Sequence, residues 1–136
     1  MTLSIVAITA AIAVPRFASA TNRSGAEAAA RRLAAGVERV RERVRLAGVP
    51  ATVTFSVGTG RVRVTGLVLS ASETELEGFD LSESPYGATI VSAKFGLLAE
   101  VTFDARGFPN SIGQVVVGRG VFERTIQIDD IGRARW

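Results

Sequence analysis

The sequence predicts an α+β protein in which a long amino-terminal helix, apolar in its first part and amphipathic in its second, packs on an antiparallel β-sheet or a small β-sandwich. Three features predict this class: an uncharged apolar run near the amino end, apolar residues at helical spacing after it, and two-residue alternation from residue 51 onward. At 136 residues, 47% of them hydrophobic, the chain is long enough to bury one core. We expect an apolar helical segment over residues 1–23 and a globular domain over residues 24–136, with a helix over 24–47 and β-structure over 50–136.

The first element is the run from Leu3 to Val14, which carries no charge and stops at Pro15. A helix of this length spans about 18 Å, against about 30 Å for the hydrocarbon core of a bilayer. The run is therefore too short to cross a membrane alone, but it is apolar on every side and suits lipid or the interior of a helix bundle. A secretory signal peptide cleaved near Ala18-Ser19-Ala20 is the alternative, although no basic segment precedes the run. The candidate membrane or filament-core residues are Leu3, Ile5, Val6, Ile8, Ile12, Val14 and Pro15.

The second element is an amphipathic helix. Ser24 and Glu27 have the spacing of a capping box, and Gly48 and Pro50 are typical of a helix end. Between them the apolar residues alternate at spacings of four and three, which forms one stripe that needs a sheet to cover it. The stripe consists of Ala26, Ala30, Leu33, Val37, Val40, Val44 and Ala47.

The rest of this helix is charged, with six arginines and three glutamates over residues 27–45. Ion pairs at helical spacing are expected for Glu27–Arg31, Glu38–Arg41, Arg39–Glu42 and Glu42–Arg45. We expect a solvated face, whose arginines are also placed to meet acidic patches of neighbouring subunits or the chain's own acidic residues 73–83. A coiled coil would need more heptads, and the interleaved glutamates weaken a nucleic-acid surface.

From residue 51 the period changes to two, which indicates seven or eight short strands. The expected elements are a hairpin of residues 51–57 and 61–69, β-runs over 88–95 and 97–103, a turn over 104–110, and a hairpin of 114–117 and 121–128 that turns at 118–120. Residues 70–85 are polar and acidic. We expect a loop there, or a short edge strand at 75–77, rather than a calcium site, because no EF-hand pattern is present.

The composition excludes much chemistry. The chain has no cysteine and no histidine, which excludes disulfides, thiolate zinc sites, cysteine nucleophiles and histidine-based triads. No phosphate loop or Ser–Lys motif is present, so we expect no enzyme and assign no catalytic, metal or cofactor residue. Asp129-Asp130 is interpreted as a solvated turn that pairs with Arg133 or Arg124.

Charge is unevenly distributed along the chain. Residues 1–63 contain ten Arg and three Glu, residues 64–105 one Lys and seven acids, and residues 106–136 five Arg and three acids. Such polarity favours end-to-end or face-to-face association of subunits.

Three stretches resemble one family. Residues 8–17, ITAAIAVPRF, resemble the later part of the apolar segment of type IV pilin-like proteins. Residues 101–107, VTFDARG, resemble the F-D-x-R/x-G turn of the GspH/FimT group of minor pilins and pseudopilins. Residues 126–128, followed by Gly132-Arg133-Ala134-Arg135, resemble the closing I-x-V and G-R-x-R stretch of that group. The resemblance covers residues 3–47 and 97–136 in the family's order.

The resemblance implies a structural minor subunit of a type II secretion pseudopilus or a type IV pilus. Such a subunit is held by a single pass in the bacterial inner membrane with its globular domain in the periplasm, and then assembles with other pilin-like subunits into a filament. Aligning on Pro15 places Met1 about seven residues inside the family's mature chain. We therefore expect upstream codons to encode Gly-Phe-Thr-Leu-x-Glu or a near variant.

A binding role is the alternative function. In one branch of the group the G-R-x-R stretch is linked to DNA contact during uptake, which the resemblance carries to Arg133 and Arg135. Two arginines neutralise about two phosphates, so such binding would be weak, salt-sensitive and blind to sequence. The competing interpretation is that both are strand residues paired with Asp129, Asp130 or Glu123. A third possibility is an exported β-sandwich adhesion domain with a cleaved signal.

Overall fold

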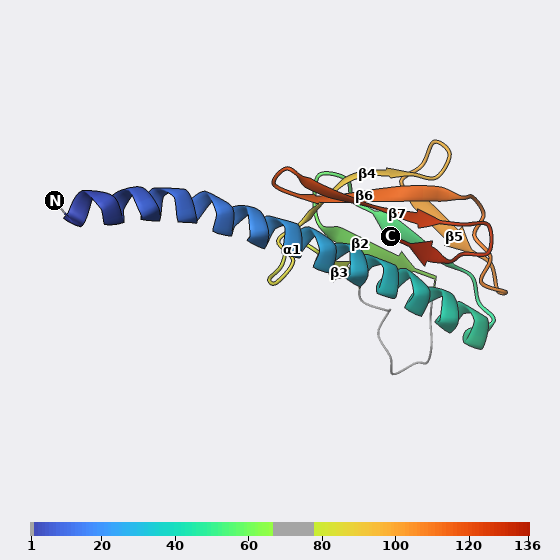
Figure 1. Ribbon diagram of the computed structural model, residues 1–136. Coiled ribbons are helices and arrows are strands. Elements are labelled where there is room, and N and C mark those ends of the chain that lie inside the picture. The colour runs from blue at the N-terminus through green and yellow to red at the C-terminus, as the bar shows by residue number, and fades with distance from the viewer. Residues whose placement is uncertain (1, 67–77) are drawn as a thin grey trace.

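The computed structural model describes residues 2–66 and 78–136, and for residues 2–18 it describes the helical backbone alone. In these ranges one long helix is followed by eight short strands, which confirms the α+β class (Figure 1). The elements are α1 Thr2–Ala47, β1 Ala51–Phe55, β2 Arg61–Thr65, β3 Phe79–Asp80, β4 Thr89–Lys94, β5 Glu100–Phe103, β6 Gly113–Arg119, β7 Phe122–Ile128 and β8 Ala134–Arg135.

Helix α1 is continuous over 46 residues and includes both Pro15 and Ser24. At 1.5 Å per residue it is about 69 Å long. The helix start expected at Ser24 is therefore wrong. Residues 21–23 are already helical, so their carbonyl groups accept from the first amides after Ser24, and no side-chain cap is needed there. The helix ends where the sequence indicates, with the Gly48 N–H donating to the Val44 carbonyl at 2.8 Å.

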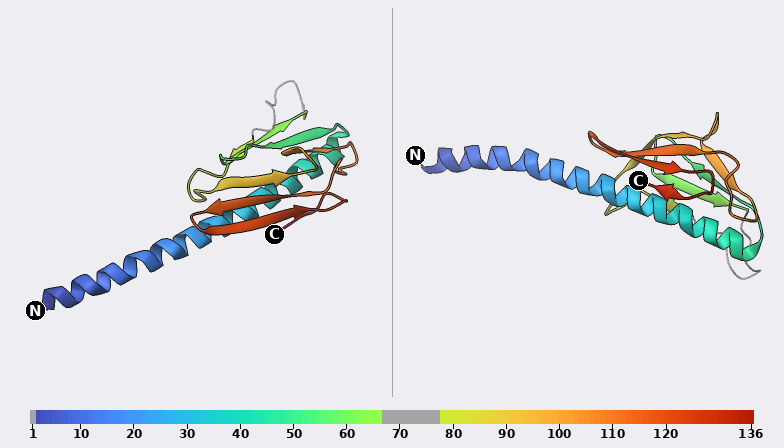
Figure 2. Two further views of the ribbon diagram at one scale, coloured as in Figure 1. Left: turned by 90° about the horizontal axis from the view of Figure 1, so that it is seen from above. Right: turned by 45° about the vertical axis from the view of Figure 1, so that its right-hand side comes forward.

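The strands form two antiparallel four-stranded sheets, ordered β3-β2-β1-β5 and β4-β6-β7-β8. Helix α1 packs chiefly on β6, β7 and β8 of the second sheet (Figure 1, Figure 2). Strands β4 and β5 follow each other in the chain but belong to different sheets. The sheets are also joined at the β1–β2 turn, where the Gly58 N–H donates to the Ile90 carbonyl at 2.9 Å and the Ile90 N–H donates to the Thr59 carbonyl at 2.7 Å.

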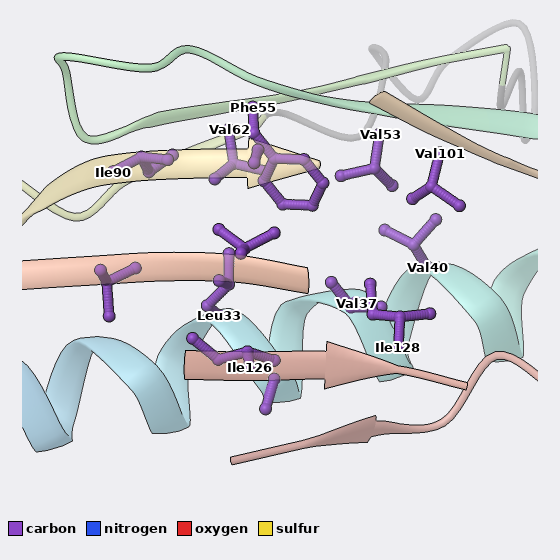
Figure 3. Packing of buried hydrophobic residues seen from close by; sticks show 14 of the residues in the cluster. Leu33, Val37, Val40, Val53, Phe55, Val62, Ile90, Val101, Ile126 and Ile128 are labelled. Atoms are coloured by element: carbon purple, nitrogen blue, oxygen red, sulfur yellow. The ribbon is translucent and has the colours of Figure 1, made fainter. Parts of the chain in front are cut away.

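One apolar cluster joins α1 to both sheets (Figure 3). The predicted stripe of α1 is confirmed from Ala26 to Val44, whereas Ala47, in the last turn of the helix, is exposed. Alternate residues of the strands complete the cluster, and the rings of Phe55 and Phe95 stack with centroids 5.6 Å apart. Among the residues with described side chains, no polar or charged residue is fully buried, so burial of apolar surface holds the domain together.

Two details of the β half differ from expectation. Strand β6 continues through Gly118 to Arg119, and the turn lies at Gly120–Val121 rather than at residues 118–120. Arg119 pairs with Phe122 in the β6–β7 ladder, and its guanidinium donates to the Tyr86 carbonyl rather than to the turn. The polar stretch 70–85 contains the short edge strand β3. The expected strand residues 67–69 and 75–77 lie outside the described residues.

Candidate assembly helix and carboxyl-terminal arginine strand

The amino-terminal part of α1 projects away from the β-sheets (Figure 1, Figure 2). From residue 19, where side chains are first described, the earliest buried positions are Gly25 and Ala26. The helix before Gly25 is therefore roughly 35 Å long at 1.5 Å per residue. The seven candidate filament-core residues, from Leu3 to Pro15, all belong to this projecting part. Within the described ranges, no helix is both long enough and apolar enough to cross a membrane.

Close contacts fix α1 where it leaves the domain. A Cβ added at Gly25 would lie 2.5 Å from Arg119 Nη1 and 2.7 Å from the Tyr86 carbonyl oxygen, so only a glycine lets these groups approach the helix. The Arg119 guanidinium donates to the Tyr86 carbonyl at 3.0 Å. Arg124 of β7 pairs with Glu27 of α1, also at 3.0 Å. The domain therefore sets the direction of the projecting helix.

The charged face of α1 is partly as expected. The Glu38–Arg41 pair, at 3.4 Å, and the Glu42–Arg45 pair, at 4.0 Å, are confirmed. Neither the expected Glu27–Arg31 pair nor the Arg39–Glu42 pair is present among the described side chains. The reason for the first difference is tertiary: β7 brings Arg124 to Glu27, and the Arg31 guanidinium instead lies 5.1 Å from the centre of the Trp136 ring.

Two five-residue loops, residues 104–108 and 129–133, share one hydrogen-bond pattern. In each, Oδ1 of the first residue, an aspartate, accepts the N–H groups of the third and fifth residues at 2.8–3.1 Å. The backbone N–H of the aspartate donates to the carbonyl group of the fifth residue of the loop. The N–H of the fourth residue, a glycine, donates to the backbone carbonyl of the aspartate. The fourth residues, Gly107 and Gly132, have φ of 86° and 85°, the left-handed conformation that a type I turn with a G1 bulge requires.

These twin aspartate loops pack against each other beside the carboxyl-terminal half of α1. A Cβ added at Gly132 would lie 2.8 Å from the Gly107 carbonyl oxygen and 3.1 Å from Arg41 Cδ. A Cβ added at Gly107 would lie 2.8 Å from Arg45 Cγ. The stems of Arg41 and Arg45 therefore cover the two glycines. The F-D-x-R-G turn and the G-R-x-R stretch, which are far apart in sequence, form one structural unit.

Arg133 and Arg135 are both exposed, and they flank Ala134, whose N–H donates to Glu38 Oε1 at 3.0 Å. This bond attaches β8 to α1. The expected pairing of these arginines with acids is wrong: within the described part of the chain neither guanidinium has an ion-pair partner. The Asp129 carboxylate is engaged instead by backbone N–H groups of its own loop.

The carboxyl group of Asp80, in β3, has a pKa below its ordinary value. The main cause is the Ser82 hydroxyl, which donates to Asp80 Oδ1, followed by the Ser82 N–H at 2.9 Å. Arg61 Nε, 3.9 Å from Asp80 Oδ2, adds a smaller effect. These contacts close the turn after β3. No group of three metal-binding side chains occurs among the residues that the structure describes.

The twin aspartate loops and the close packing at Gly25 are not predicted from the sequence. The Asp-x-x-Gly spacing of Asp104–Gly107 recurs at Asp129–Gly132, each time directly after a strand, and this repeat was the available signal for the twin loops. The close packing at Gly25 had no local signal, because its neighbours Tyr86 and Arg119 are distant in sequence.

A continuous helix whose amino-terminal part projects from two small antiparallel sheets has the pilin-like α+β fold. Several solved structures share it, among them the following three. The type IV minor pilin FimU of Pseudomonas aeruginosa is 16% identical at a TM-score of 0.62, covering 83% of this chain and 88% of its own. Two structures of the minor pseudopilin EpsH from the type II secretion system of Vibrio cholerae are 13% and 14% identical at TM-scores of 0.63 and 0.62. They cover 83% and 82% of this chain and 95% and 94% of their own. No protein-family model and no curated protein matches the chain.

Proposed function

We propose that this chain is a structural minor subunit of a filament, either a type II secretion pseudopilus or a type IV pilus. The observation that carries the proposal is the projecting part of α1. Its residues 3–14 are uncharged, all but Ser4 and Thr9 are apolar, and the helix that bears them extends away from the domain (Figure 1). Apolar surface of this extent is unfavourable in water and needs a cover. Lipid of the inner membrane covers it before assembly, and helices of other pilin-like subunits cover it afterwards.

The fold comparison supports the same proposal. FimU is described as a minor pilin and EpsH as a minor pseudopilin, and the present chain shares the fold of both. On this proposal the globular domain lies in the periplasm and forms part of the filament surface. The close contacts of Gly25 with Arg119 and the Tyr86 carbonyl, called the Gly25 clamp below, keep α1 in a fixed direction for packing.

Recovery of the chain with sheared filaments tests the proposal. We expect the wild-type chain, expressed in its own cells, to co-purify with other pilin-like subunits. The double variant Ile5→Asp, Ile12→Asp should be lost from that fraction, because a charge is unfavourable both in lipid and among packed apolar helices. At the centre of a membrane-inserted helix an aspartate costs about 2.5–3.5 kcal/mol. Thr125→Asp, on an exposed position of β7, is the control and should be recovered like the wild type. Equal recovery of both variants, or no recovery of the wild type, would refute the proposal.

A DNA-binding minor pilin is the second candidate. The observation that favours it is that Arg133 and Arg135 are exposed and, among the described residues, have no acidic partner. Their guanidinium groups are therefore free to contact phosphates. Asp130 is exposed beside them and would weaken the attraction.

Mobility-shift titration with duplex DNA at two salt concentrations tests this candidate. We expect weak binding, with a dissociation constant in the micromolar range or above. The double variant Arg133→Gln, Arg135→Gln should lose most of this binding, and the slope of log affinity against log salt concentration should fall by the amount expected for about two phosphate contacts. Arg63→Gln, Lys94→Gln removes two other exposed cations, on β2 and β4, and is the matched control. Equal binding by the two double variants would remove the DNA role and leave filament assembly.

A further inference from the structure

Helix α1 has two different flanks on either side of its buried stripe. One flank faces β7 and β8, where Glu27 pairs with Arg124 and Glu38 accepts from the Ala134 N–H. The other flank faces β2 and β3. It carries Arg32, Arg39 and Arg43, which the helical repeat of 100° per residue places in one row with Gly36.

Two contacts fix the position of the second flank. The Arg32 guanidinium lies 4.2 Å from the centre of the Phe79 ring, and a Cβ added at Gly36 would lie 2.6 Å from Phe79 Cζ. Strand β3 therefore covers the flank at Arg32 and Gly36. Arg39 and Arg43 follow one and two turns later along the helix.

Glu42 lies beside this flank, three residues after Arg39 and four before Leu46, and its carboxylate is 4.0 Å from Arg45 Nη1. Glu27, Glu38 and Glu42 each have a partner on other faces. Arg39 is exposed and Arg43 is half-buried, and neither has an ion-pair partner among the residues that the structure describes. A half-buried guanidinium without a carboxylate is costly, because part of its hydration is lost without compensation. Among the described residues, Arg39 and Arg43 thus carry positive charge without a paired carboxylate.

The side chains beside this row are apolar. Ala35 is exposed, and Leu46 retains 79% of its accessible surface, both on the solvent side of Arg39. Arginine is enriched at the centre of protein–protein interfaces, whereas lysine, which this surface lacks, is depleted there. Three arginines would neutralise only about three phosphates, which gives a nucleic acid little hold. The composition therefore favours a protein as the occupant.

We propose that the basic flank of α1, formed by Arg32, Ala35, Arg39, Arg43 and Leu46, is the docking surface for a carboxylate-bearing segment of a neighbouring pilin-like subunit. The inference rests on the proposed filament function. Carboxylates of the neighbour pair with Arg39 and Arg43, because a planar guanidinium binds a carboxylate through two parallel hydrogen bonds. Ala35 and Leu46 exclude water from these pairs when the neighbour packs over them. The flank thereby selects subunits whose acidic residues lie opposite Arg39 and Arg43 when the subunits pack together.

Site-specific photo-crosslinking in the full chain, expressed in its own cells, tests the inference. The probe is p-benzoylphenylalanine in place of Ala35, and each adduct is mapped by mass spectrometry. We expect an adduct to an acidic segment of another pilin-like subunit. Its yield should fall about tenfold in Arg39→Glu, Arg43→Glu, since two attractive pairs become repulsive, and to a smaller extent in Arg39→Gln, Arg43→Gln. The matched control is Lys94→Glu, Arg106→Glu, which changes net charge equally at exposed positions on other elements and should leave the yield unchanged.

The other outcomes separate this inference from the proposed function. An adduct to the chain's own residues 73–83, to a nucleic acid, or to a partner in a manner insensitive to charge reversal would overturn the inference. So would the absence of an Ala35 adduct while the chain still co-purifies with sheared filaments, and the proposed function would then stand. Loss of the chain from the filament fraction, in the wild type as well, would overturn both.

Discussion

At the scale of single residues, the neighbouring aspartates of the second aspartate loop show how position decides a role. Asp129 accepts the N–H groups of Ile131 and Arg133 through one carboxylate oxygen. Asp130 is exposed and makes no hydrogen bond or ion pair within the described chain. The sequence predicts that the two aspartates form a turn and pair with arginines. They do form a turn, but the Asp129 carboxylate accepts hydrogen bonds from backbone N–H groups instead of pairing with an arginine.

We predict that Asp129→Ala lowers the free energy of unfolding by about 1–3 kcal/mol, because two N–H groups of the loop lose a charged acceptor. Asp130→Ala is the adjacent control and should change it by less than about 0.5 kcal/mol. Urea unfolding of both variants measures the difference. Equal effects would mean that the Asp129 bonds do not stabilise the loop.

Gly25→Ala provides a second residue-scale prediction. Helix propensity alone would favour alanine by about 1 kcal/mol. The added methyl would however meet Arg119 Nη1 and the Tyr86 carbonyl oxygen, so we expect a net loss of about 1–3 kcal/mol in the free energy of unfolding. Thermal or urea unfolding measures it. A stabilised variant would show that Arg119 moves aside freely and that the Gly25 clamp does not hold α1.

At the scale of elements, the sequence predicts those stretches whose signals are local. The apolar stripe from Ala26 to Val44, the end of α1 at Gly48 and the hairpins follow from periodicity and turn residues. The predicted long helix with an apolar first part and an amphipathic second part is confirmed, but the cap expected at Ser24 is not, because a capping pattern is also an acceptable helix interior. The division of β4 and β5 between two sheets, and the meeting of the twin aspartate loops, depend on contacts between residues distant in sequence.

The continuous helix leads to a prediction at Ser24. If Ser24 capped a helix, Ser24→Ala would lower the free energy of unfolding by about 0.5–2 kcal/mol. Because Ser24 is an exposed residue inside α1, we expect instead no loss or a gain of a few tenths. Circular dichroism during urea unfolding of the full chain distinguishes the two. A destabilisation above about 0.5 kcal/mol would show that α1 is interrupted there.

At the scale of the whole molecule, the core of the domain and the projecting helix are separate. Among the residues with described side chains, the buried stripe of α1 begins at Ala26, and the cluster that joins it to both sheets begins at Ala29. We therefore predict that residues 24–136 fold alone, with a single cooperative thermal transition. Differential scanning calorimetry of this fragment measures it. An insoluble product or a non-cooperative transition would mean that residues 1–23 belong to the core.

The projecting helix carries the central claim, that the chain joins other pilin-like subunits through residues 3–14. The absence of native cysteine allows a single reporter to be placed there. We would introduce Ile8→Cys and, as the control, Thr125→Cys on the exposed face of β7, and treat sheared filaments with a short bismaleimide. The account predicts adducts between position 8 and the apolar helices of other pilin-like subunits, with none of this kind from position 125. Recovery of the chain without such adducts at position 8, or with the same adducts from both positions, would contradict it.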